Sequence, residues 1–117
     1  MATILLVEND EEFRQHLADG IRSAGHRVVE AANGSDGLAR FDTDAPALVI
    51  TDIVMEQVEG IELLLDIRKQ APELPVIAIS GNDQYLRNSR KLGATRALLK
   101  PFRVRELLDC IDDLISV

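Results

Sequence analysis

The pattern that decides the fold begins with the stretch Ile4-Leu5-Leu6-Val7-Glu8-Asn9-Asp10, in which four apolar residues lead directly into three polar ones. A short, continuous apolar run is typical of a strand that is covered on both faces of a sheet. Phe13, Leu17, Ile21 and Ala24 follow at near-helical spacing, and Gly25 ends that pattern. This region therefore predicts a buried strand, a polar turn and a helix.

The same order of elements recurs along the rest of the chain. Further strands are predicted at residues 27–31, 48–51, 76–79 and 96–99. Further helices are predicted at about 35–41, where Gly37 weakens the helical preference, and at 60–70, 83–92 and 104–115. Five strands that alternate with five helices predict an α/β fold. Right-handed crossovers would then build a doubly wound parallel sheet with helices on both faces.

Length and composition are those of one ordinary domain over residues 1–117, with 46% hydrophobic and 28% charged residues. The net charge of −7 repels phosphate backbones and anionic membranes, so we expect no direct binding to nucleic acid or to a membrane. A single cysteine, Cys110, and the lack of a signal-peptide or membrane-spanning pattern favour a cytoplasmic location.

Polar residues follow four of the predicted strands at their carboxyl ends. They are Glu8-Asn9-Asp10, Asp52, Ser80 and Lys100. Each of them alone has a simpler explanation, because polar residues after strands often cap helices or form turns. Ligands of open parallel sheets bind beyond the carboxyl ends of the strands, so we expect these side chains to converge. Together they supply what phosphoryl transfer needs, namely a carboxylate nucleophile, a hydroxyl, an ammonium and oxygen ligands for a divalent cation.

Four segments together resemble the receiver domains of bacterial two-component response regulators. They are Ile4-Leu5-Leu6-Val7-Glu8-Asn9-Asp10, Thr51-Asp52-Ile53-Val54-Met55, Ile79-Ser80-Gly81, and Gly93-Ala94 through Lys100-Pro101-Phe102. The similarity covers essentially the whole chain and implies a flavodoxin-like (CheY-like) fold with strand order 2-1-3-4-5. It also implies a place in a phosphorelay, where a sensor histidine kinase or a histidine phosphotransfer protein supplies the phosphoryl group. The phosphorylated domain would then bind a downstream protein, which the sequence does not identify. Such a domain is not an enzyme in the usual sense and catalyses only its own phosphorylation and dephosphorylation.

The resemblance gives each residue at the strand ends a role. Asp52 corresponds to the phosphoacceptor, Ser80 to the hydroxyl that responds to the phosphoryl group, and Lys100 to the lysine that contacts it. Gly60 corresponds to the glycine that closes the loop after the phosphoacceptor. The bond between Lys100 and Pro101 is expected to be cis.

The resemblance also implies a Mg²⁺ site, made by Glu8, Asn9, Asp52 and the backbone carbonyl of Val54. Asn9 departs from the family, which has an aspartate there. An asparagine keeps an oxygen but lacks the charge, so we expect weaker Mg²⁺ binding. Asp10 is a possible further ligand, although a cap on the first helix is the favoured role for it.

Two other departures from the family pattern lie near the surface with which receivers bind their partners. Ala97 stands where many receivers carry an aromatic residue whose rotation accompanies phosphorylation. The stretch from Ser80 to Lys100 is about two residues shorter than the common pattern, and Glu56 stands where proline is frequent. We expect the shorter stretch and Glu56 to alter specificity and to leave the fold intact. Ala97 has no rotamer to change, so a response at this surface would work through shifts of the backbone, helices or loops.

Several alternatives stay open at this stage. A degenerate receiver, supported by Asn9 and Ala97, would bind partners without phosphate. A small flavodoxin-like enzyme is disfavoured, because the chain has no glycine-rich turn after its first strand. The start at Met1 weakly favours a stand-alone protein over an excised domain. A homodimer through the last helices is possible, whereas His16, His26 and Cys110 are expected to have no catalytic role.

Overall fold

The computed structural model describes residues 2–53 and 59–115, and residue 59 is described by its backbone alone. Its strands are β1 (Thr3–Val7), β2 (Arg27–Ala31), β3 (Leu48–Asp52), β4 (Val76–Ser80) and β5 (Arg96–Leu99). Its helices are α1 (Glu11–Ser23), α2 (Gly34–Asp44), α3 (Glu59–Gln70), α4 (Asp83–Lys91) and α5 (Val104–Ile115). The predicted alternation of strands and helices is confirmed.

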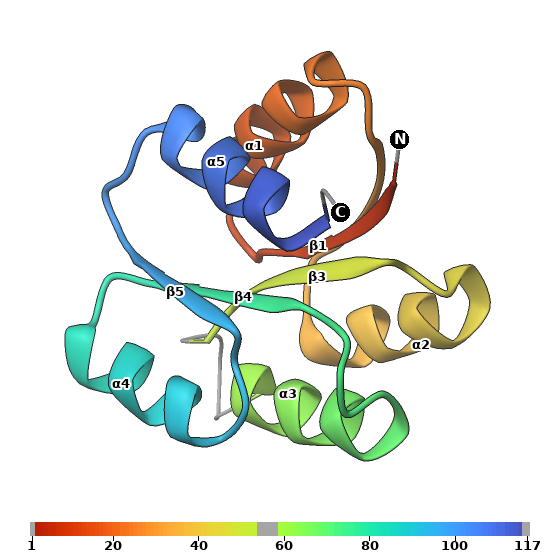
Figure 1. Ribbon diagram of the computed structural model, residues 1–117, viewed down its shortest axis with the longest axis vertical. Helices are drawn as coiled ribbons and strands as arrows, with labels where there is room; N and C mark the ends of the chain where they lie inside the picture. The colour runs from red at the N-terminus through yellow and green to blue at the C-terminus, as the bar shows by residue number, and fades with distance from the viewer. Residues whose placement is uncertain (1, 54–58, 116–117) are drawn as a thin grey trace.

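All neighbouring strands pair in parallel, and their order across the sheet is β2-β1-β3-β4-β5. Helices α1 and α5 cover one face, and α2, α3 and α4 cover the other (Figure 1). This is the doubly wound, flavodoxin-like arrangement that the resemblance implied. The strand order reverses beside β1, which places the carboxyl ends of β1 and β3 at the position where such sheets bind ligands.

Side chains alternate between two apolar layers, as the pleat of a strand requires. Ile4 and Leu6 of β1 face α1 and α5, and they pack there with residues such as Leu17 and Leu107. Leu5 of the same strand packs in the opposite layer, beneath α2, α3 and α4. The core is built almost wholly from aliphatic residues. Its two layers cover the two faces of the sheet.

Helix α2 is longer than the sequence predicted, since it spans Gly34–Asp44 and not 35–41. Asn33, which the sequence assigned to a turn with Gly34, caps the helix, because its side chain accepts a hydrogen bond of 2.8 Å from the backbone N–H of Asp36. Gly37 does not weaken the helix but lets it approach the sheet, because a Cβ there would lie 2.9 Å from Cγ2 of Val7. Packing therefore overrides the low helical preference of glycine.

The ends of the other helices follow local capping rules. Asp10 caps α1 by accepting a hydrogen bond of 3.2 Å from the N–H of Phe13, which is the favoured of the two roles expected for it. Asn82 caps α4, and Gly93 follows that helix with a φ of 117°. Within the described ranges, none of the helices is both long enough and apolar enough to cross a membrane.

Candidate functional site

Three of the predicted residues meet at the carboxyl edge of the sheet. The Nζ atom of Lys100 donates a hydrogen bond of 2.9 Å to Oε1 of Glu8 and one of 2.8 Å to Oδ2 of Asp52. Glu8 follows β1, Asp52 is the last residue of β3, and Lys100 follows β5, which β4 separates from β3. Because all these strands are parallel, their carboxyl ends bring the three side chains to one edge of the sheet. The side chains of Glu8 and Asp52 are only 1% and 6% exposed, whereas that of Lys100 is 26% exposed. The predicted convergence of these three side chains is confirmed in the structure.

Both carboxylate oxygens of Glu8 already have partners within the chain. Oε1 accepts from Lys100, and Oε2 accepts a hydrogen bond of 2.9 Å from the backbone N–H of Asp10. The backbone carbonyl of Glu8 accepts a further bond of 2.8 Å from Nη1 of Arg14, whose Nε pairs with Glu30. Hydrogen bonds from Lys100, from the Asp10 backbone and from Arg14 therefore hold Glu8 in place.

Burial and charge act against each other on the ionisable groups of this cluster. Burial raises the pKa of Glu8, and the hydrogen bonds from the Asp10 backbone and Lys100 lower it only in part, so that its pKa lies above the ordinary value. Burial alone would lower the pKa of Lys100, but the hydrogen bonds and charges of Asp52 and Glu8 outweigh it and raise that pKa. Lys100 therefore stays an ammonium at neutral pH.

Ser80 lies at the same edge, at the end of the adjacent strand β4, and is fully buried. Its Oγ accepts a hydrogen bond of 3.0 Å from the backbone N–H of Asn82. In the register of the sheet, Asp52 pairs with Ile79, so Ser80 stands one residue beyond the level of Asp52. An oxygen that accepts from Asn82 still carries a hydroxyl hydrogen, which can be donated to a ligand.

The metal ligands expected from the resemblance are only partly placed. Glu8 and Asp52 bind one common ammonium, so their oxygens can also share one divalent cation. Asn9 is exposed directly after Glu8, Asp10 is engaged as a helix cap, and Val54 lies outside the described residues. Over residues 2–53 and 59–115, no group of three or more His, Cys, Asp or Glu side chains is placed to hold a metal. The carboxylate oxygens of Glu8 and Asp52 are ligands of the kind that Mg²⁺ prefers, but the ammonium of Lys100 offsets part of their negative charge.

Gly60 stands where the resemblance placed the glycine that closes the loop. A Cβ at this position would clash with the backbone carbonyl oxygen of Asp52 and would lie 2.8 Å from Cα and O of Ile53. These neighbours are backbone atoms at the end of a buried strand, so they cannot move aside cheaply. Gly60 therefore allows α3 to pack against the segment that carries Asp52.

Replacing Gly60 with alanine should destabilise the fold by about 1–3 kcal/mol, because the added methyl group overpacks this contact. Urea unfolding of the variant measures the loss. Gly81→Ala is the matched control, since a Cβ at Gly81 meets nothing within 4 Å. Equal stabilities for the two variants would contradict the close-approach argument.

The remaining residues singled out in the sequence have structural positions. Ala97 of β5 pairs with Ala78 and packs half-buried against the layer beneath α2, α3 and α4. His16 is exposed, and Nδ1 of His26 accepts a hydrogen bond of 3.3 Å from the N–H of Ala2. Cys110 is half-buried in the layer beneath α1 and α5, and burial raises the pKa of its thiol. Glu56 lies outside the described residues.

Sequence reasoning missed the residues that support Lys100. The ring of Phe13, in the first turn of α1, has its centroid 4.8 Å from Nζ of Lys100. Phe102 contacts that ring edge-on, with the two centroids 5.8 Å apart and the planes at 67°. Phe13 fits the apolar periodicity of the first helix and so indicates only a core residue, and no sequence signal tied either ring to an ammonium.

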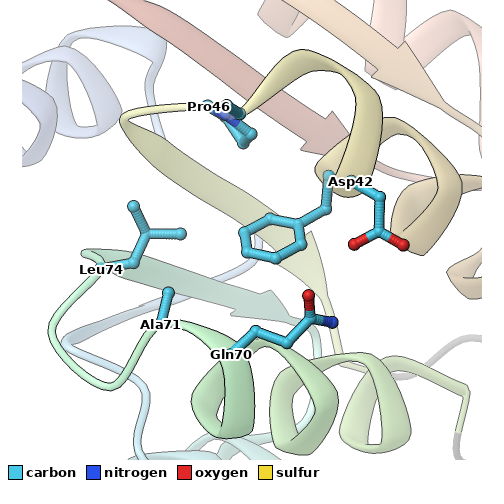
Figure 2. Close-up of a pocket in the computed structure, with 7 residues that line it drawn as sticks. Asp42, Pro46, Gln70, Ala71 and Leu74 are labelled. Atoms are coloured by element: carbon cyan, nitrogen blue, oxygen red, sulfur yellow. The ribbon is translucent and has the colours of Figure 1, made fainter.

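A separate hollow of about 320 Å³ lies at the opposite edge of the sheet, between the carboxyl ends of α2 and α3 (Figure 2). Phe41, Pro46, Ala71 and Leu74 form its apolar walls. Pro46 precedes β3, whereas Asp52 ends that strand, so the full length of β3 separates this hollow from the ionic cluster. The hollow is therefore no part of the candidate site.

Comparisons with known proteins agree with this geometry. The model of the response regulator receiver domain family matches residues 4–112. The chain is 32% identical to the response regulator receiver protein CpdR of Brucella abortus (strain 2308), over 98% of each chain. It is 35% identical to the response regulator protein FleR of Pseudomonas aeruginosa over 94% of this chain but only 24% of that protein.

Solved structures of receivers share the fold over nearly the whole chain. The receiver domain of NtrX from Brucella abortus superimposes with a TM-score of 0.91 at 31% identity and covers 97% of this chain and 98% of its own. The response regulator TrrA from Thermotoga maritima, solved in complex with Mg²⁺ and BeF, gives a TM-score of 0.90 at 27% identity, over 98% and 100% of the two chains. The chain therefore belongs to the response regulator receiver domain family, the phosphoacceptor signalling modules of two-component systems.

Proposed function

We propose that Asp52 accepts the phosphoryl group, from a phosphohistidine on a sensor histidine kinase or on a histidine phosphotransfer protein. Receiver domains interact with such proteins and are in general signalling modules and not enzymes. The observation that carries the assignment is the nearly buried carboxylate of Asp52 at the end of the central strand, held 2.8 Å from the ammonium of Lys100. A carboxylate in this setting is oriented for attack and has a cation beside it to balance charge.

The transfer step follows from the positions of these groups. A carboxylate oxygen of Asp52 forms a bond to phosphorus while the bond between phosphorus and the histidine nitrogen breaks, and the histidine ring keeps that electron pair. Lys100 remains beside the acyl phosphate and neutralises charge on the phosphoryl oxygens. The hydroxyl of Ser80 donates a hydrogen bond to one of these oxygens and so couples β4 to the phosphorylated state. Attack by water on the same phosphorus returns Asp52 to a carboxylate.

Receiver domains typically bind Mg²⁺, and this chain has oxygen donors of the right kind. We assign the site to Glu8, Asn9, Asp52 and the backbone carbonyl of Val54, with Asp10 retained as a helix cap. Mg²⁺ supplies positive charge at the phosphoryl oxygens when it is bound. Asn9 and the engagement of both Glu8 oxygens weaken the affinity, because a metal ion has to compete with the ammonium of Lys100.

We also propose the residue range of the domain, the kind of partner it binds and its location in the cell. One receiver domain over residues 1–117 is supported by a family match and a sheet that together span most of the chain. It would signal through contacts with an unidentified downstream protein, in the cytoplasm and without direct contact to nucleic acid or membrane. The net charge of −7 supports the last point.

The decisive experiment is incubation with acetyl phosphate and Mg²⁺, followed by intact-mass measurement. We expect the wild type to gain the mass of one phosphoryl group and Asp52→Asn to gain none. Asp44→Asn is the matched control, because it removes a carboxylate at the far end of α2 and should leave the gain unchanged. A folded wild type that gains no mass, or an Asp52→Asn variant that still gains it, would contradict the assignment. The first result would instead favour a degenerate receiver.

A further inference from the structure

The ammonium of Lys100 contacts two carboxylates and one aromatic ring in this structure. It donates to Glu8 and Asp52, and the face of the Phe13 ring lies against it with its centroid 4.8 Å from Nζ. A cation within about 6 Å of a ring centroid is attracted by the negative face of the ring. The position of the ammonium is therefore set by two carboxylates and one aromatic ring.

The ring itself is held in place by a second aromatic residue. Phe102 contacts Phe13 in an edge-to-face geometry at 5.8 Å, and both rings pack against the layer of core residues beneath α1 and α5. Phe102 stands two residues after Lys100, whereas Phe13 belongs to the first turn of α1. Phe13 thus ties the loop after β5, which carries Lys100, to the helix that follows the Glu8 turn.

A long side chain that is 26% exposed would otherwise have several rotamers open to it. We propose that Phe13 is a positioning residue, which holds the ammonium of Lys100 between Glu8 and Asp52 and thereby keeps it ready for the phosphoryl group. The inference rests on the proposed function of Asp52. Phe13 does not touch the reacting atoms and acts only through Lys100.

Replacement of the ring by an apolar side chain separates this role from simple core packing. Phe13→Leu and Phe13→Met keep an apolar residue but remove the ring face, and Phe13→Tyr keeps the ring face. Loss of one cation–π contact corresponds to a slowing of phosphorylation by acetyl phosphate of about fivefold. We expect this slowing in the leucine and methionine variants, and a rate close to that of the wild type in the tyrosine variant.

A second readout reports on the ammonium directly. The proton–nitrogen signal of the Lys100 ammonium in NMR spectra at low temperature is visible only when a fixed position protects it from rapid exchange with water. We expect this signal in the wild type and in Phe13→Tyr, and its loss in Phe13→Leu and Phe13→Met. Phe41→Leu is the matched control, because it makes the same truncation at the hollow on the far edge of the sheet (Figure 2).

The outcomes distinguish the two proposals. Retention of both the signal and the rate in Phe13→Leu or Phe13→Met would overturn the positioning role, as would an equal loss of both in Phe41→Leu. Loss of the signal in both ringless variants, with rescue by tyrosine, supports the role. Should even the wild type gain no phosphoryl group, the function proposed for Asp52 fails, and the ammonium signal still decides the role of Phe13.

Discussion

Replacing Asn9 with aspartate should tighten Mg²⁺ binding by about tenfold or more, because it returns a full negative charge to the turn after β1. Two unit charges about 4 Å apart interact by about 4 kcal/mol at an effective dielectric constant of 20, and desolvation and the nearby ammonium offset part of this energy. Asn9 is exposed, so its side chain can turn toward the cation without rebuilding the core. Titration of Mg²⁺ into both proteins, followed by NMR shifts of the amides around Asp52, measures the two dissociation constants.

The control for this prediction adds the same charge elsewhere. Asn88→Asp places a new carboxylate on α4, where Oδ1 of Asn88 already accepts a hydrogen bond of 3.2 Å from Gln84. It changes the net charge as Asn9→Asp does and should leave Mg²⁺ affinity close to that of the wild type. Equal affinities of the wild type and Asn9→Asp would refute the charge argument. Equal gains in the two variants would show that the effect is not local to the site.

The sheet could be predicted from the sequence because its strands are buried on both faces. Each strand is a short apolar run, and the polar residues that follow these runs mark the carboxyl edge. The meeting of Glu8, Asp52 and Lys100 followed from that geometry alone, since parallel strands bring their ends to one side. The full length of α2 did not follow, because the low helical preference of Gly37 argued against it, and the sequence does not show that a glycine is needed there for the close approach to Val7.

The finer structure of the site lies in contacts that no pattern encodes. The second oxygen of Glu8 is occupied by a backbone N–H, and the turn is also held by Arg14. An arginine on an amphipathic helix looks like any solvated residue until its partner is known. The contact of Phe13 with Lys100 joins residues that are far apart in sequence. Such contacts depend on rotamers and crossing angles, which periodicity leaves undetermined.

Replacing Lys100 with methionine should make the stability of the protein depend strongly on Mg²⁺, whereas the wild type should depend on it weakly. Removal of one partner from a buried ion pair costs up to roughly 3–5 kcal/mol, and here it leaves Glu8 and Asp52 without their common cation. Lys100 is partly exposed, so we expect a loss at the lower end of that range. Mg²⁺ then binds the carboxylates of Glu8 and Asp52 without competition from the Lys100 ammonium, so its binding restores stability by mass action. Urea unfolding with and without Mg²⁺ measures both effects, and Lys91→Met, which removes an exposed charge in the last turn of α4, is the control.

The pH dependence of the same variant gives an independent check on its cause. The pKa of Glu8 is already raised by burial and by the charge of Asp52, and loss of the Lys100 hydrogen bond removes one of the contacts that lower it. A carboxyl group whose folded pKa lies above its unfolded value stabilises the fold fully below the unfolded value, and this contribution is lost as the pH rises through the folded pKa. The deficit of Lys100→Met relative to the wild type should therefore shrink as the pH falls from neutral toward the ordinary carboxyl range. A deficit that stays constant with pH and is not reduced by Mg²⁺ would instead reflect lost packing of the lysine stem, because apolar contacts respond to neither protons nor cations.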